Sequence, residues 1–402
     1  MTGPPDPFAR PRTPRLAVYL DQAYWRAGDR VVAERSFVLF LNHVAQHFDD
    51  MTVIGRLSDG PPRGEYALAP GVRFVALPEY RAGGAEALGV ARVLPASLSR
   101  VIGVLRQTDV LWLFGPGPLA GAIAGAAALA RTPVVLGVRQ HLPSYARSRH
   151  PDRRMVHVAA DTMEASFRML ARRWPTVVVG PELARRYGHA RSLLSVTVSL
   201  VSSADILSAA QTERRYDGAL EILVVSRLDR EKNPLLLADA FAALNPPDRW
   251  RMVICGDGPL RAALSDRLTE LGVGDRVTLR GHVALHDGLL ALYRRAHVLL
   301  HVSWTEGLPQ VLFEAFAAGC PVVATDVGGV AEASGDAALL IPPGDAQAAA
   351  DALMRIAGEP RLRDRLVQAG RALARQHTVE REAAATAAFL AAAARRPGRV
   401  TS

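Results

Sequence analysis

Short runs of β-branched and apolar residues alternate with helical stretches along most of the chain, and this alternation limits the fold more than any other feature. In the first half, the runs expected to be strands are Leu16–Leu20, Met51–Ile54, Val72–Ala76, Val110–Phe114, Val134–Val138, Val177–Val179 and Ser195–Val198. In the second half they are Leu220–Ser226, Met252–Cys255, Val277–Leu279, Val298–Val302 and Pro321–Ala324. Apolar strands between helices indicate parallel sheets covered on both faces, so the fold class is α/β.

The chain has 402 residues, which exceeds one ordinary domain. We therefore expect two Rossmann-like domains that face each other across a cleft. The expected units are a Pro-rich tail (1–14), an N-terminal domain (15–205), a linker (206–217), a C-terminal domain (218–376) and a final helix and tail (377–402). After the first strand we expect a polar loop, Asp21–Asp29, and then a helix around Ala33–Phe48.

The segment Val110–Ala130 carries no charge and is long enough to cross a membrane. The run Gly115–Pro118 interrupts it, so a strand, a turn and a buried helix (Leu119–Ala130) explain it better than a span. The start of the chain has no apolar core typical of a signal peptide. Cys255 and Cys320 are the only cysteines, and this sparse usage favours a reduced, cytoplasmic location.

Positive charge is concentrated in the first half of the chain. The net charge of the chain is +9. Residues 1–215 hold 27 basic and 17 acidic side chains, so the first half alone has a net charge that exceeds that of the whole chain. Such a surface suits an anionic membrane or an acidic partner. Nucleic acid is not expected, because the arginines are scattered. The segment Glu164–Trp174 has an apolar stripe flanked by arginines. It either lies on a membrane that carries a lipid-linked or anionic acceptor, or packs into its own domain.

The loop after the strand Leu220–Ser226 carries two cations, Arg227 and Lys232, five residues apart. Both can reach one diphosphate at the start of the next helix, where arginine offers a planar fork and lysine a point charge. Lys232 is the only lysine among 48 basic residues, which draws attention to this loop. The alternative is a solvated polar turn.

Two further loops follow strands of the second half. Gly256 and Gly258, on either side of Asp257, permit a tight turn that is equally compatible with a purely structural role. In the stretch 303–315, Glu306 stands in the loop and Glu314 in the following helix. These carboxylates can accept hydrogen bonds from a sugar and from a ribose diol, or they are a capping glutamate and a surface glutamate. Glu314 lies among apolar neighbours and therefore needs a partner.

Taken together, SRLDREK, GDGPL, VTLRGHV and EGLPQVLFEAFAAGCPVVAT resemble the retaining glycosyltransferases of family 4, which have the GT-B fold. The likeness is close over Leu220–Asp345 and covers the first half only in outline. It implies transfer of a sugar from a nucleotide-diphosphate sugar, UDP-linked in preference to GDP-linked, with no metal or other cofactor. Arg227, Lys232 and Glu306 would be catalytic. The implied donor-binding residues are Arg227, Lys232, Gly256, Asp257, Arg280, Gly281, His282, Glu306, Gly307, Leu308 and Glu314.

The first half departs from the family pattern. Only Gly28 remains where a glycine pair is usual, and Arg139 and His141 stand near the place of a His-Asp pair. These three residues are the candidates for the side of the site that binds the acceptor, although His141 is equally a plain loop histidine. A non-catalytic subunit that binds nucleotide sugars or glycans is the alternative function. A dinucleotide-dependent oxidoreductase is a third and poorer alternative, since no G-x-G-x-x-G follows the first strand.

Overall fold

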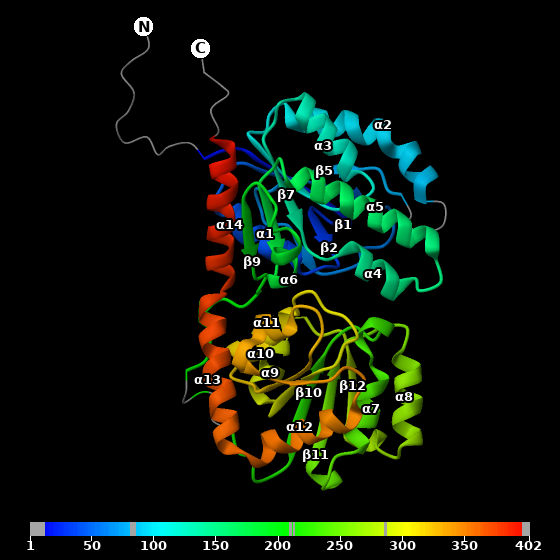
Figure 1. Ribbon diagram of the computed structural model, residues 1–402, viewed down its shortest axis with the longest axis vertical. Coiled ribbons are helices and arrows are strands. Elements are labelled where there is room, and N and C mark those ends of the chain that lie inside the picture. The colour runs from blue at the N-terminus through cyan, green and yellow to red at the C-terminus, as the bar shows by residue number, and fades with distance from the viewer. Residues whose placement is uncertain (1–12, 81–85, 209–210, 212–213, 285–287, 396–402) are drawn as a thin grey trace.

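The computed structural model describes residues 13–80, 86–208, 211, 214–284 and 288–395, and these residues form two domains, each built on its own sheet (Figure 1). The expected tails at 1–12 and 396–402, and part of the expected linker, lie outside the described residues. The domain limits themselves stay a prediction, whereas the two Rossmann-like domains are confirmed.

The N-terminal sheet is a parallel sheet with an antiparallel extension. Its parallel order is β5–β3–β1–β6–β7–β8–β9, and β2 and β4 extend it antiparallel from β1. The strands are β1 (Leu16–Ala27), β2 (Arg30–Ala33), β3 (Met51–Leu57), β4 (Tyr66–Ala67), β5 (Arg73–Leu77), β6 (Val110–Phe114), β7 (Val134–Val138), β8 (Thr176–Val179) and β9 (Leu193–Val196). The strand–helix–strand interpretation of Val110–Ala130 is correct, and no helix of the described segments is both long and apolar enough to cross a membrane.

Alternate residues of β1 enter two different cores, as the two-residue period of a strand requires. Leu16 and Val18 pack with α1 (Phe37–Ala45) and α14 (Val379–Ala394). Ala17 and Tyr19 pack on the other face with helices α2, α3 and α5. The helices of this domain are α1, α2 (Glu86–Leu105), α3 (Ala120–Leu129), α4 (Leu142–Arg149), α5 (Arg154–Ala171) and α6 (Pro181–Arg186).

The C-terminal sheet is parallel throughout, in the order β12–β11–β10–β13–β14–β15. Its strands are β10 (Leu220–Val225), β11 (Trp250–Cys255), β12 (Val277–Gly281), β13 (Val298–His301), β14 (Val322–Thr325) and β15 (Ala338–Ile341). Its helices are α7 (Leu235–Ala242), α8 (Arg261–Glu270), α9 (Leu290–Arg295), α10 (Gln310–Ala317), α11 (Val330–Ser334), α12 (Ala346–Gly358) and α13 (Pro360–Gln376). In both sheets the chain reverses direction beside the first strand, at β1/β6 and at β10/β13. Ligands of open parallel sheets bind at such points, beyond the carboxyl ends of the strands.

The last two helices join the domains along one side of the molecule (Figure 1). α13 packs against α10 of the C-terminal domain, and α14 packs against α1 of the N-terminal domain. Glu382 fixes the start of α14, because its carboxylate accepts hydrogen bonds from the Thr197 amide (3.1 Å) and from His377 Nδ1 (2.6 Å). The final helix therefore belongs to the core of the first domain.

Two expectations for the first half are wrong. Asp21–Asp29 is not a polar loop, because β1 continues to Ala27 and turns back into β2 through Gly28, whose φ of 64° suits a tight turn. The helix expected around Ala33–Phe48 consequently begins later, at Phe37. The sequence indicates a loop here because this part of β1 contains the polar residues Asp21, Gln22 and Arg26.

For the segment Glu164–Trp174, the interpretation as internal packing is correct. Phe167 is 3% exposed, and Leu170 and Trp174 pack against the same core of the N-terminal domain. That apolar stripe is therefore not a membrane-binding surface.

Candidate active site

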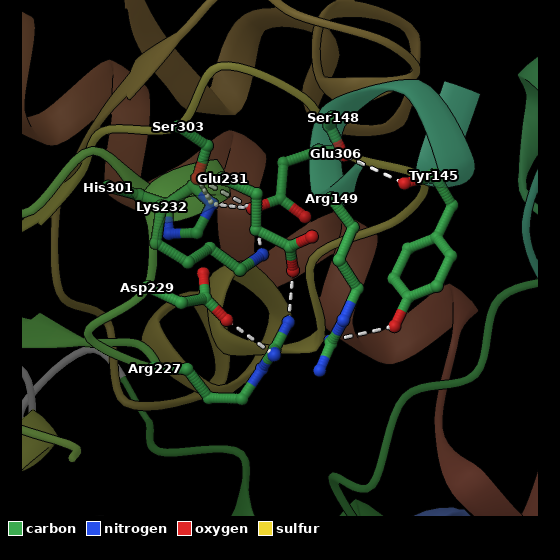
Figure 2. Close-up of polar contacts among 10 residues, drawn as sticks. All are labelled: Tyr145, Ser148, Arg149, Arg227, Asp229, Glu231, Lys232, His301, Ser303 and Glu306. Atoms are coloured by element: carbon green, nitrogen blue, oxygen red, sulfur yellow. Dashed lines mark hydrogen bonds and ion pairs between the residues drawn. The ribbon is translucent and has the colours of Figure 1, made fainter. Parts of the chain in front are cut away.

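Glu306 is the centre of the most densely connected polar cluster in the cleft-facing loops of the second domain. Its side chain is 7% exposed, and one oxygen, Oε1, accepts three hydrogen bonds (Figure 2). The donors are Lys232 Nζ at 2.5 Å, Ser303 Oγ at 2.7 Å and His301 Nε2 at 2.8 Å. A carboxylate can only accept, so the His301 proton resides on Nε2.

The charge of Glu306 is stabilised by its neighbours. Burial acts to raise the pKa of the carboxyl group, but the Lys232 charge and the His301 contact outweigh it and hold the pKa well below its usual range. Glu306 is therefore an anion at neutral pH. Because all three protein donors bind Oε1, the other oxygen is available to a ligand.

Backbone contacts between neighbouring loops hold this cluster in place. Thr325 Oγ1, at the end of β14, bonds both the amide and the carbonyl of Ser303 at 3.0 Å. The Trp304 amide donates to the Glu231 carbonyl at 2.9 Å and so joins the Glu306 loop to the Lys232 loop. The short 3-10 turn Arg230–Lys232 brings Lys232 toward Glu306.

Arg227 lies on the same loop but points to acids of that loop rather than to Glu306. It pairs with Asp229 at 2.5 Å and with Glu231, and its side chain is 55% exposed. Helix α4 of the N-terminal domain lies against this loop and brings Arg149 and Tyr145 beside it; Arg149 Nη1 donates to the Tyr145 hydroxyl at 2.9 Å (Figure 2). This loop thus carries two cations, Arg227 and Lys232, and a third, Arg149, lies beside it on the other domain.

Gly256 and Asp257 lie directly behind Arg227. A Cβ at Gly256 would stand 1.7 Å from the Ser226 carbonyl oxygen, so only glycine fits, and the Leu228 amide donates to the Asp257 carbonyl at 2.9 Å. This turn supports the Arg227 loop. A direct contact of either residue with a ligand stays a prediction.

Arg280 and His282 line a pocket of about 350 Å³ next to that turn. Gly281 links the two, because its carbonyl accepts a hydrogen bond from the Gly256 amide at 2.7 Å. Glu65 of the N-terminal domain also lines this open pocket, and its carboxylate lies 3.1 Å from His282 Nε2. The predicted donor-binding residues Arg280 and His282 therefore line a pocket to which both domains contribute.

Glu314 is 5% exposed and has found the partner that its apolar surroundings demand. Its Oε2 accepts a hydrogen bond from the Tyr293 hydroxyl at 2.7 Å, and no cation of the described residues forms an ion pair with it. Burial raises the pKa of Glu314 to about 7, while the Tyr293 bond acts in the opposite direction. The alternative of a surface glutamate is wrong. The predicted ribose contact stays a prediction.

The three candidates in the first domain lie in different settings. Gly28 is in the β1–β2 turn, with no atom near the place of a Cβ. His141 precedes α4 and contacts Ser144 Oγ at 2.7 Å; burial and the nearby Arg186 lower its pKa. Arg139 is half-buried, and its carbonyl lies 3.9 Å from where a Cβ on Gly307 would stand. Of the three, Arg139 is thus the one placed against the Glu306 loop.

Leu308 of that loop also meets the first domain, 3.3 Å from where a Cβ on Gly180 would stand. Four residues of the site have no role predicted from the sequence: His301, Ser303, Glu231 and Arg149. His301 and Ser303 could have been found from their spacing, since both stand within five residues of Glu306 where a strand ends. Arg149 could not, because it reaches the loop only through the arrangement of the two domains.

Comparison with known proteins agrees with this geometry. Residues 208–373 match the family model described as glycosyl transferases group 1. This match covers most of the second domain. An α-1,4-N-acetyl-D-galactosaminyltransferase of Campylobacter jejuni is 38% identical over 108 residues, which are 25% of this chain and 29% of that protein. The chain spans less than half the length of the first four curated relatives that it matches.

A longer alignment includes part of the first domain. The 2-deoxystreptamine glucosyltransferase of Streptomyces kanamyceticus is 29% identical over 291 residues, 68% of this chain and 72% of that protein. Among solved structures, Anabaena HepE in complex with UDP superposes with a TM-score of 0.68 at 18% identity, over 94% of this chain and all of the other. The described residues of both domains therefore have the GT-B fold.

Proposed function

We propose that this chain is a retaining glycosyltransferase that moves a sugar from a nucleotide-diphosphate sugar to an acceptor. The observation that carries the proposal is the buried Glu306 carboxylate, which Lys232, His301 and Ser303 hold at one oxygen on the ligand-binding edge of a group 1 domain. A surface loop without function would not keep a desolvated ion pair, since burying two charges is costly.

The proposed chemistry divides among these residues. Glu306 Oε2 accepts hydrogen bonds from hydroxyls of the donor sugar, and the amides of Gly307 and Leu308 lie next to the phosphates. As the bond between the sugar and the diphosphate breaks, negative charge grows on the leaving oxygen. Lys232 and Arg227 stabilise that charge, which is the form of assistance that preorganised cations give to a transition state. To reach the phosphates, Arg227 exchanges Asp229 and Glu231 for the ligand.

We propose a UDP-sugar as the donor and a GDP-sugar as the alternative. Anabaena HepE, which shares the fold, has been solved with UDP and with UDP-glucose. The pocket lined by Arg280 and His282 is the proposed site of the base, and Glu314 the proposed ribose contact. No metal or further cofactor enters the proposal.

A panel of nucleotide sugars tests the donor. The expected result is that one UDP-sugar raises the Tm and is slowly hydrolysed or transferred, with UDP released. The anomeric configuration of the product, read by NMR, tests retention. Binding without any turnover across a wide range of acceptors would instead support the non-catalytic subunit, and a protein that binds no nucleotide sugar would contradict both functions.

We further propose a cytoplasmic enzyme that touches an anionic membrane through the outer face of α5. Met155, Val158 and Met169 are exposed there by 81%, 60% and 62%, and Arg154 and Arg168 are exposed beside them. Each arginine near such a surface contributes about 1 kcal/mol to binding. Flotation with anionic vesicles at low salt should recover the protein, and high salt or neutral vesicles should not. Equal absence from both vesicle types would contradict this location.

A further inference from the structure

Arg139 is a cation at the domain interface that has no anionic partner. Its guanidinium lies over the ring of Phe37, 4.4 Å from the centroid, and among the described residues it forms no ion pair. Burial and the like charge of Arg35 lower its pKa to about 10, and the only other group acting on it is Tyr24. The side chain is half-buried, so this charge is partly removed from water, which is costly without a partner, and no acid of the described residues pairs with it.

Neighbouring side chains are unsatisfied as well. Gln22 is 8% exposed, and neither atom of its amide makes a hydrogen bond; the buried Tyr24 hydroxyl is likewise unbonded. Burial raises the pKa of Tyr24, whereas the Gln22 amide and the Arg139 charge are close enough to act against that shift. Buried polar groups that lack hydrogen-bond partners lower the stability of the folded protein. We refer to Gln22, Tyr24, Arg35 and Arg139 as the anion cluster, because all four can donate hydrogen bonds and none is negatively charged.

The anion cluster lies at the ligand-binding edge of the first sheet. Gln22 stands where β1 leaves its pairing with β6, at the reversal point of the strand order, and Arg139 directly follows β7. Atoms next to the cluster in the chain also contact the second domain. The Arg139 carbonyl opposes Gly307, and Ser36, next to Arg35, lies 3.2 Å from Gln310 through their side-chain oxygens. A group bound by the cluster would thus lie beside the Glu306 loop.

We propose that the anion cluster binds a phosphate or carboxylate group of the acceptor substrate, so that the acceptor of this chain is anionic. This inference rests on the proposed function, since it assigns the acceptor of that same reaction. The donor diphosphate is the other anion in the reaction, but its proposed cations, Arg227 and Lys232, lie on a loop of the opposite domain. If UDP fills the donor site, any further anion that binds must bind elsewhere, as an acceptor group would.

The direct test measures the binding of small anions to the full chain saturated with UDP. Calorimetry and thermal shift at matched ionic strength detect the binding. Orthophosphate and glucose 6-phosphate should bind and raise the Tm, and glucose should not. Arg139→Gln should weaken orthophosphate about 10- to 100-fold, as expected for losing a charged hydrogen bond, with UDP affinity unchanged. Arg35→Gln, at an exposed position, should weaken it in the same direction. Arg73→Gln removes an arginine paired with Asp50 and is the matched control.

Gln22→Met gives an independent readout, because it removes a buried amide at nearly constant volume. It should raise the Tm of the protein without anions and at the same time weaken glucose 6-phosphate. The proposal is wrong if orthophosphate gives no more than the effect of sodium chloride, if Arg139→Gln and Arg35→Gln bind it like wild type, or if Gln22→Met changes only the Tm. Loss of UDP affinity in Arg139→Gln would assign that cation to the donor instead. Arginine-dependent binding of orthophosphate by a protein that binds no nucleotide would leave the anion site standing and overturn only the transferase.

Discussion

Lys232 sets the electrostatics of the site at the scale of single residues. Its side chain is 15% exposed and forms an ion pair with the more deeply buried Glu306. Removing one partner of such a pair leaves the other charge uncompensated, and this penalty exceeds the net value of the pair. The two residues are therefore best understood as one unit that serves the donor.

Lys232→Ala should lower turnover by 10²–10³-fold, or about 2.7–4 kcal/mol, because the lost charge stabilises the leaving group as it forms. Steady-state kinetics with the donor identified by the panel measures the loss. Arg230→Ala, which removes an exposed arginine of the same turn, should stay close to wild type. Wild-type turnover in Lys232→Ala would contradict the assignment.

Glu314 predicts a pH dependence of stability. Its pKa is about 7 in the folded protein and near 4.5 when unfolded, so between these values the native state holds more protons than the unfolded state. Stability consequently falls as pH rises from about 5 to 7, by about 3 kcal/mol at most. Glu314→Gln should remove this fall in urea titrations at pH 5 and 8. An equal pH response in wild type and variant would show that Glu314 ionises as freely when folded.

The same residue tests the ribose contact. Glu314→Ala should weaken UDP binding more than it lowers turnover at saturating donor, since the ribose is remote from the reacting bond. Calorimetry with UDP measures the affinity, and Glu306→Gln, expected to affect chiefly turnover, is the comparison. Unchanged UDP affinity in Glu314→Ala would assign this glutamate to packing with Tyr293 alone.

At the scale of elements, the sequence predicts buried parallel strands best. Val110–Phe114 and Val134–Val138 are strands with the predicted limits, because each is a short apolar run that both faces of the sheet must cover. The hairpin of β1 and β2 was missed. Its residues include Asp21 and Gln22, whose polarity indicates a loop until the side chains around them are known. β15 was missed as well, because the alanine and leucines of Ala338–Ile341 favour a helix rather than a strand.

The site divides in the same way. The loops of Arg227 and Glu306 follow strands with clear patterns, so their meeting at one sheet edge could be predicted. The ion pairs within the site could not be predicted. Arg227 pairs with Asp229 and Glu231, while Lys232 pairs with Glu306. Which cation pairs with which carboxylate depends on distances of a few ångströms, and spacing along the chain does not contain them.

The Glu382 carboxylate joins the start of α14 to the first domain. Glu382→Ala should lower the free energy of unfolding by about 1–3 kcal/mol, because it leaves the Thr197 amide without its hydrogen-bond partner and releases His377. Glu380→Ala is the matched control, since that exposed carboxylate only approaches the Ser203 amide at 3.3 Å. Urea unfolding of both variants gives the comparison. Equal stability would show that α14 is held by its apolar face alone.

At the scale of the whole molecule, the polar contacts between the facing loops of the two domains are weak. Arg185 pairs with Glu332 across the interface, and His282 with Glu65, but these side chains are 44–59% exposed. Exposed pairs of this kind contribute about 0–1 kcal/mol each. The domains are joined firmly only at the crossing helices, so a donor bound between them is expected to draw them together.

Hydrogen exchange should detect this response to UDP. Amides of 306–312 should exchange more slowly because the nucleotide binds there, and amides of 181–186 should follow because that helix faces the same loop from the other domain. Strands β6 and β7 should not change. Slower exchange confined to the second domain would show that UDP binds without moving the first.

The position of α14 has a consequence for folding of the chain during its synthesis on the ribosome. The first domain needs this helix to cover α1 and the adjoining strands, yet the helix is synthesised after the entire second domain. At the moment when 205 residues have emerged, an apolar face is left open to water and to other nascent chains. We expect the second domain to reach its final state first, and a chaperone to shield that face until the last residues arrive.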